Sequence, residues 1–237
     1  MRVVTNPIQA CNDIFMRPGS VFEALKTHNN WSWIPFFIVS ILAVLPSYLY
    51  FSSVDPVWYT DYVSTNSADL RDLSPAEIET IMQFQQPEAM ATYSLIGGVI
   101  GVIIINAIIA IYYNLVARSD EECVMGYTDW YGATWWMSMP IVIGSLASVL
   151  AIFVTNDAGQ IELPAISATS FAFIFGVGID SSWFNFLNTI RLETFLSIYI
   201  AACALAAWTS FTFKKCIMLA IIPTALIYGI MLLVNVM

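Results

Sequence analysis

Five stretches of the chain run for about 20 residues without a charged side chain. Each is rich in Ile, Val, Leu, Ala or Phe, and Trp, Tyr or Phe residues border it, as in the interfacial belts of membrane helices. An α-helix needs about 20 apolar residues to cross a hydrocarbon core of about 30 Å, because each residue rises about 1.5 Å. We therefore predict an all-α, polytopic membrane protein with transmembrane helices at 34–53, 93–116, 134–155, 194–213 and 216–236.

The composition agrees with a chain that meets lipid over much of its surface. Apolar residues make up 59% of the chain and charged residues 11%, against roughly 45–50% and about 25% in soluble proteins. The formal net charge is −9, so no positive field is available for phosphate backbones. We expect the lipid bilayer as a partner and no nucleic acid.

The basic residues predict which side of the membrane each loop occupies. With five spans and a cytoplasmic N-terminus, six of the eight Lys and Arg residues lie on the cytoplasmic side and two outside, in keeping with the positive-inside rule. A sixth span at 163–179 would reduce this to five against three, and that stretch is short and interrupted by glycines. We therefore place the C-terminus in the periplasm and interpret 161–190 as an interfacial or re-entrant element.

Outside the spans, helix-start signals predict short helices. In the cytoplasmic lead-in 1–33, Asn6-Pro7 resembles an N-cap followed by proline at the first helical position, and Ser20 with Glu23 resembles a capping box that starts a second amphipathic helix. In the outer loop 54–92, Ser74-Pro75 predicts another helix start, with Pro87 ending that helix. Residues 34–237 are expected to form the membrane domain.

A search for chemistry finds no catalytic, metal-ligating or cofactor-binding pattern in the sequence. The single histidine, His28, lies in the lead-in, and no predicted span carries an ionisable group of the kind that coupled transporters use. We expect no cofactor and no bound metal, and the chain is not expected to be an enzyme. The four cysteines are not expected to form disulfides, because three fall on the cytoplasmic side and one inside a span.

The remaining candidates are residues for helix packing or ligand contact. Gly97 and Gly101 form a G-x-x-x-G pattern that favours close approach of another helix, either the third span or a helix of a second copy. Asn106 is the most polar side chain deep in a span, and we expect an interhelical hydrogen bond there in preference to a ligand contact. Three prolines lie inside predicted spans and should kink them; one is Pro140.

Several short patterns, in order along the chain, resemble the Yip1 family, and specifically its bacterial inner-membrane members. They are the Asn6-Pro7 helix, Asn30-Trp31-Ser32-Trp33 with Pro35-Phe36, Trp130-Tyr131 with Trp135-Trp136 and Pro140, Trp183-Phe184, and Ala207-Trp208 before Lys214-Lys215. The resemblance implies a five-helix membrane domain with a cytoplasmic N-terminus. It supplies no reaction and no functional residues.

Together these observations favour a non-enzymatic scaffold or interaction protein of the bacterial envelope, with a second copy or another membrane protein as partner. The alternative is a small-molecule transporter or channel whose site lies between the second, third and fourth spans. The residues bordering that site would be Asn106, Trp135, Trp136 and Pro140. A membrane-embedded enzyme is the third and least favoured class.

Overall fold

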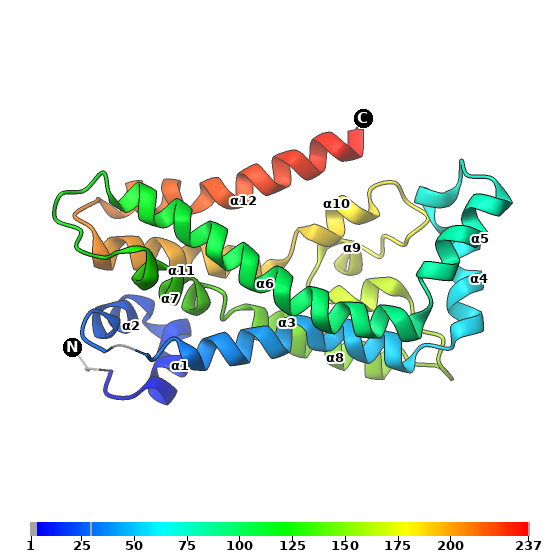
Figure 1. Cartoon of the computed structure of the whole chain (residues 1–237), viewed down its shortest axis with the longest axis horizontal. Coiled ribbons are helices and arrows are strands. Elements are labelled where there is room, and N and C mark those ends of the chain that lie inside the picture. The colour runs from blue at the N-terminus through cyan, green and yellow to red at the C-terminus, as the bar shows by residue number, and fades with distance from the viewer. Residues whose placement is uncertain (1–3, 29, 237) are drawn as a thin grey trace. The chain divides into compact units, whose positions relative to one another are not determined.

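A computed structural model of the chain describes residues 4–28 and 30–236 (Figure 1). Regular structure in these residues is helical, apart from two isolated β-bridges. The α-helices are α1 (Pro7–Met16), α2 (Pro18–Leu25), α3 (Trp33–Ser53), α4 (Pro56–Asn66), α5 (Pro75–Phe84), α6 (Pro87–Ala117), α7 (Tyr127–Met137), α8 (Ile141–Thr155), α9 (Phe171–Ile174), α10 (Phe184–Thr189), α11 (Leu192–Trp208) and α12 (Phe213–Val236), with 3-10 turns η1 (Ala68–Leu70) and η2 (Leu163–Ser167).

Four helical stretches are long and apolar enough to cross a membrane: α3, α6, α7 continued by α8, and α12. They confirm four of the five predicted stretches as candidate spans. The fifth, α11, is apolar but has 17 residues, which corresponds to about 25 Å of helix. The five-span count and the side on which each end lies therefore stay predictions.

Three of the helices have bounds that differ from those of the predicted spans. The second predicted span lies in α6, which begins at Pro87. This proline follows the end of α5 and also starts α6. The third begins at Tyr127, where Asp129 at the third helical position accepts a hydrogen bond from the Gly126 N–H (2.9 Å). The fourth ends at Trp208, five residues earlier than predicted.

The predicted third span is interrupted at residues 138–140, where a kink was predicted at Pro140. Proline has no N–H to donate and its ring crowds the preceding turn. The Ser138 N–H still bonds to the Thr134 carbonyl (3.0 Å), and the Ile141 N–H then bonds only three residues back, to Ser138 (3.0 Å). This tight turn separates α7 from α8.

The chain forms two compact units, which we describe separately. The first consists of residues 1–41, 101–142 and 193–227. Its core contains three Trp side chains that are at most 2% exposed, at positions 130, 135 and 136. The Asp120 carboxylate joins two loops of this unit by accepting hydrogen bonds from the Ser210 N–H (2.5 Å) and hydroxyl (2.8 Å). These bonds hold the pKa of the Asp120 carboxyl below its ordinary value.

The lead-in helices α1 and α2 are part of the first unit and lie side by side (Figure 1). Their buried apolar residues, Ala10, Ile14, Val21 and Phe22, belong to its core. The Trp208 Nε1–H donates to the Phe22 carbonyl (2.8 Å), and the two rings meet edge to face at 5.9 Å. Carbonyls in the last turn of a helix lack partners within the helix. The Trp208 indole therefore supplies the hydrogen bond that the Phe22 carbonyl of α2 would otherwise lack.

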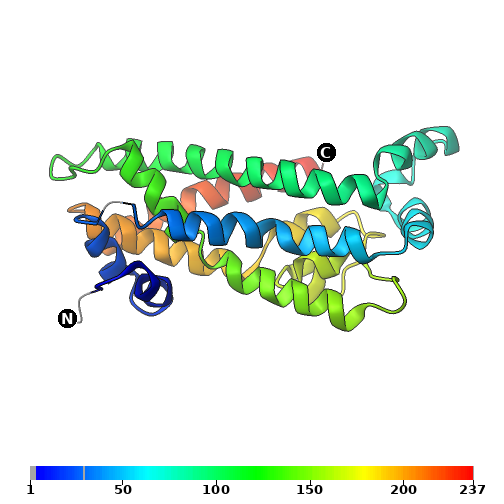
Figure 2. The same cartoon turned by 60° about the horizontal axis from the view of Figure 1, so that its bottom comes forward.

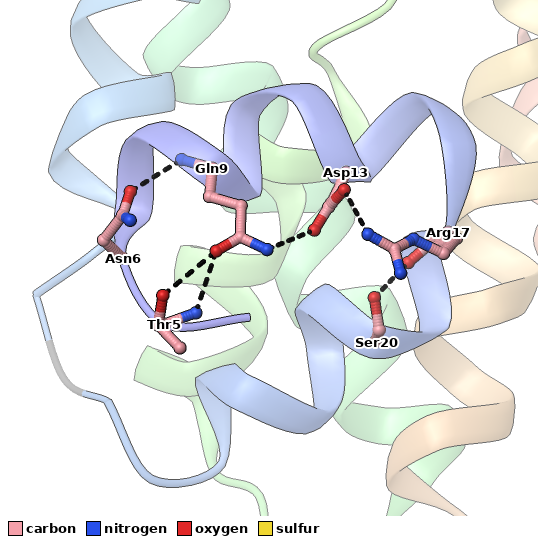
Figure 3. A network of polar contacts seen from close by, with 6 residues as sticks. All are labelled: Thr5, Asn6, Gln9, Asp13, Arg17 and Ser20. Atoms are coloured by element: carbon pink, nitrogen blue, oxygen red, sulfur yellow. Dashed lines mark hydrogen bonds and ion pairs between the residues drawn. The ribbon is translucent and has the colours of Figure 1, made fainter. Parts of the chain in front are cut away.

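Polar contacts along α1 join its start to α2 (Figure 3). Asn6 caps α1 as predicted, its side chain accepting from the Gln9 N–H (2.8 Å), and Gln9 then bonds to Asp13 (3.0 Å). Arg17 pairs with Asp13 (2.7 Å). The capping box predicted at Ser20 was wrong, because α2 already begins at Pro18. The Ser20 hydroxyl lies inside the helix and donates to the Arg17 carbonyl (2.8 Å).

The second unit consists of residues 42–100, 143–192 and 228–237. Here α4 and α5 are neighbours (Figure 2), and the predicted start of α5 is confirmed as a complete capping box between Ser74 and Glu77. The segment 161–190 packs its buried apolar side chains into the core of this unit. The Tyr50 hydroxyl donates to the Ile161 carbonyl (2.9 Å), which ties α3 to that segment.

Candidate functional site

The first unit contains a groove of about 650 Å³. It is lined by the end of α2, by residues 28, 30 and 32, by the first turn of α3, and by residues of α6, α7 and α11. Aromatic and aliphatic side chains form most of the wall, and polar side chains gather on the segment before α3 and on the first turn of α7. We call it the aromatic groove; its residues are Leu25, His28, Asn30, Ser32, Trp33, Phe36, Ile103, Thr128, Asp129, Tyr131, Gly132, Trp135 and Trp208.

Four aromatic rings follow one another along one wall of this groove. Trp33 meets Phe36 edge to face (ring centroids 5.4 Å apart), Phe36 meets Trp135 (4.7 Å), and Trp135 meets Tyr131 (5.9 Å). Edge-to-face pairs at these separations are the arrangement that the ring quadrupoles favour. The wall is therefore a connected aromatic surface, with Trp33 58% exposed at one end.

Ser32, the residue before α3, is in close contact with α7 at this groove. The Trp136 Nε1–H donates to the Ser32 Oγ (3.1 Å), and a Cβ placed on Gly132 would lie 2.9 Å from that same Oγ. Only glycine allows this approach without displacing Ser32. Asn30 turns the chain into α3 with a positive φ of 72°, a conformation that Asn tolerates better than most residues.

The polar rim carries one formally charged side chain, Asp129. Its carboxylate accepts the Gly126 N–H at the start of α7. Within residues 4–28 and 30–236 the ion pairs are Arg17–Asp13 and Lys26–Glu23, so no cation there neutralises Asp129. The His28 Nδ1 lies 3.1 Å from the Ala24 carbonyl.

A second, smaller cavity of about 90 Å³ lies in the first unit, between α6, α7, α11 and α12. Such a volume holds a few water molecules. Its polar lining comes from all four helices and the turn after α7: Asn106, Tyr113, Thr134, Ser138, Ser197 and Thr224. We call it the Asn106 cavity.

Two hydrogen bonds link the segments that form this cavity. The Ser138 hydroxyl donates to the Asn106 Oδ1 (3.1 Å), while the Asn106 amide donates to the Val102 carbonyl of its own helix (2.9 Å). Pro223, which lines the cavity, lies inside α12 and offers no N–H to the carbonyl four residues before it. That carbonyl, of Leu219, accepts from the Tyr112 hydroxyl instead (2.8 Å).

The residues predicted to border one transporter site do not come together. Asn106 lines its own cavity, whereas Trp135 lines the aromatic groove. Trp136 is buried and bonds to Ser32, and Pro140 lies in the turn between α7 and α8. These residues therefore do not line one hollow, and a transporter site between the second, third and fourth spans stays a prediction; the Asn106 cavity lies among α6, α7 and α11.

The small-residue pattern on α6 does not bring another helix of the chain close. A Cβ added to Gly97 or Gly101 would meet no described atom within 4 Å. The close contact is at Gly98, where the added atom would lie 2.6 Å from the Val44 Cγ1. Packing of Gly97 and Gly101 against the third span is not observed, and contact with a second copy stays a prediction.

Sequence reasoning missed most of the polar rim of the groove. Asp129 lies just outside a charge-free stretch and is not among the residues named from the sequence, and His28 is a single histidine in the lead-in with no catalytic or metal-ligating pattern around it. Among the described residues, no group of three or more His, Cys, Asp or Glu side chains is placed to hold a metal ion.

Comparison with known proteins gives one match: the family model for the Yip1 domain covers residues 12–234. No curated protein and no solved structure matches the chain. Members of the family are generally non-enzymatic membrane trafficking proteins. The match covers nearly the whole chain and agrees with the apolar helices described above, so the chain is a multi-pass membrane protein that belongs to the Yip1 family.

Proposed function

We propose that the chain is a non-enzymatic scaffold or interaction protein of the bacterial inner membrane, with five spans, a cytoplasmic N-terminus and a periplasmic C-terminus. A scaffold needs a surface that is held in place and free to bind. The lead-in helices α1 and α2 fit this requirement, because their inner face belongs to the core of the first unit.

The observation that carries the proposal is the outer face of α1. Ile8 is 76% exposed and Met16 75% exposed, although Ile14 on the opposite face is fully buried. Apolar side chains presented outward by a fixed helix are typical of surfaces that bind a protein or lie in the membrane interface. We assign this face to a membrane-protein partner or a second copy of the chain.

Site-specific photocrosslinking in intact membranes tests this assignment. A photoreactive residue in place of Met16 should give a discrete protein adduct, either with one partner or with a second copy. The same group in place of Glu23, an exposed polar position on α2, serves as the matched control and should give none. Lipid adducts alone at Met16, or the same protein pattern at both positions, would contradict the proposal.

The proposed sidedness is tested by cysteine labelling of a variant without native cysteines. Two of the four native cysteines, Cys203 and Cys216, are buried and would report poorly on sidedness. Lys214 and Asp72 are exposed, and the five-span arrangement places them on opposite sides. An impermeant maleimide added to spheroplasts should label Asp72→Cys and not Lys214→Cys; the reverse pattern would reject the orientation.

One observation favours the alternative function, a small-molecule transporter or channel: the Asn106 cavity has polar side chains from several helices. Within the described helices α3, α6, α8 and α12, the apolar windows carry no cluster of charges, and ion transport normally uses such groups. We expect protein in liposomes to show no ion or proton flux above that of empty vesicles. Flux that is lost in Asn106→Leu would favour the transporter.

A further inference from the structure

We propose that the aromatic groove binds a phospholipid whose headgroup carries a primary ammonium. The proposal goes beyond the scaffold role and does not depend on it, since it uses only the groove of the first unit and the presence of a bilayer. It combines three features of the groove: its apolar depth, its unneutralised carboxylate and the hydrogen-bond donors on its rim.

The apolar part of the groove extends from the polar rim toward the middle of a span. Trp33 and Phe36 lie in the first turn of α3. Ile103, on the same groove, lies near the centre of the apolar stretch 93–116 of α6. A groove that starts among polar side chains and reaches the midpoint of a membrane helix matches an acyl chain attached to a headgroup.

The charge of the groove selects the headgroup. Asp129 is its formally charged lining residue, and no described cation pairs with it. Aromatic faces attract ammonium groups through their quadrupoles, and Tyr131 and Trp135 belong to the same lining. A carboxylate that shares a groove lining with aromatic rings therefore favours an ammonium and disfavours a headgroup with net negative charge.

The rim also offers donors for the phosphate of such a lipid. The Ser32 Oγ accepts from Trp136, so its own hydroxyl hydrogen is available to a ligand. The Asn30 amide and the Thr128 hydroxyl are further donors in the lining. Donors together with one carboxylate match the zwitterion of a phosphoethanolamine headgroup.

Native mass spectrometry of the full chain in detergent, titrated with defined lipids, tests the proposal. We expect phosphatidylethanolamine to bind about tenfold more tightly than phosphatidylglycerol, as one charge-assisted contact is worth roughly that factor. In Asp129→Asn this preference should disappear. The substitution keeps an oxygen to accept the Gly126 N–H, so α7 keeps its start. Glu121→Gln, an exposed acid outside the groove, should keep the preference.

Two further measurements distinguish a lipid from a free headgroup as the ligand and control for a folding defect. Glycerophosphoethanolamine, which has no acyl chains, should not compete; competition equal to that of the lipid would overturn the lipid assignment. Trp33→Leu, at an exposed ring, should weaken phosphatidylethanolamine binding severalfold without changing the melting temperature. Equal binding of both lipids by the unaltered protein, or an unchanged preference in Asp129→Asn, would reject the proposal.

Discussion

Replacing Phe22 with alanine should release the lead-in helices from the first unit. The ring is fully buried and packs against Trp208. Truncating a buried Phe to Ala costs about 3–5 kcal/mol, from lost transfer free energy and the cavity left behind. The carbonyl of residue 22 is unchanged, so the loss comes from packing alone.

Hydrogen–deuterium exchange of α1 and α2 peptides measures this effect. A loss of about 3 kcal/mol in the free energy of local opening should accelerate exchange of protected amides by about 100-fold. Ile8→Ala is the matched control: this side chain is 76% exposed, and such surface changes usually stay within about 0.5 kcal/mol. Unchanged protection in Phe22→Ala would show that packing of the Phe22 ring does not hold α1 and α2 against the first unit.

Two further substitutions test contacts elsewhere in the chain. Gly98→Leu should lower the melting temperature in detergent, because its Cβ would overlap Val44 and overpacking costs about 1–3 kcal/mol; Gly97→Leu, in open space, should not, and equal effects would reject the assignment of the packed face. Asp120→Asn should lower the melting temperature at pH 7. Because the pKa of Asp120 is lowered in the folded protein by hydrogen bonds from Ser210, its stabilisation is present above the ordinary Asp pKa of about 3.9 and is lost as pH falls through the folded pKa. The difference between the two proteins should therefore shrink in acid, and a difference independent of pH would contradict this.

Features that depend on local sequence could be predicted. Long apolar stretches identify the candidate spans because lipid offers no partner to an unpaired backbone. Asn6 and Ser74 act as caps because each bonds to an amide three residues ahead, a contact that needs no other part of the chain. Ser20 shows the same local signal, but the prediction of a cap there was wrong, because Pro18 starts the helix two residues earlier.

Features that depend on tertiary contacts could not be predicted. Which of the neighbouring glycines on α6 meets another helix depends on the rotation of α6 about its own axis, and the contact is at Gly98. The candidate site was only partly anticipated: Trp135 was named from the sequence, but its contact with Phe36 joins two segments about 100 positions apart. Asp129 was overlooked because a charge that ends an apolar window resembles a loop residue.

The state of the protein in its own membrane tests the scaffold proposal most directly. Native mass spectrometry of the chain, extracted with surrounding lipid from native membranes, would report the mass of whatever it is bound to. The proposal predicts a discrete assembly heavier than the single chain of 26.4 kDa, containing a second copy or one defined protein partner. The proposal would be contradicted by a single chain that carries only lipid, provided that the same extraction preserves known membrane complexes.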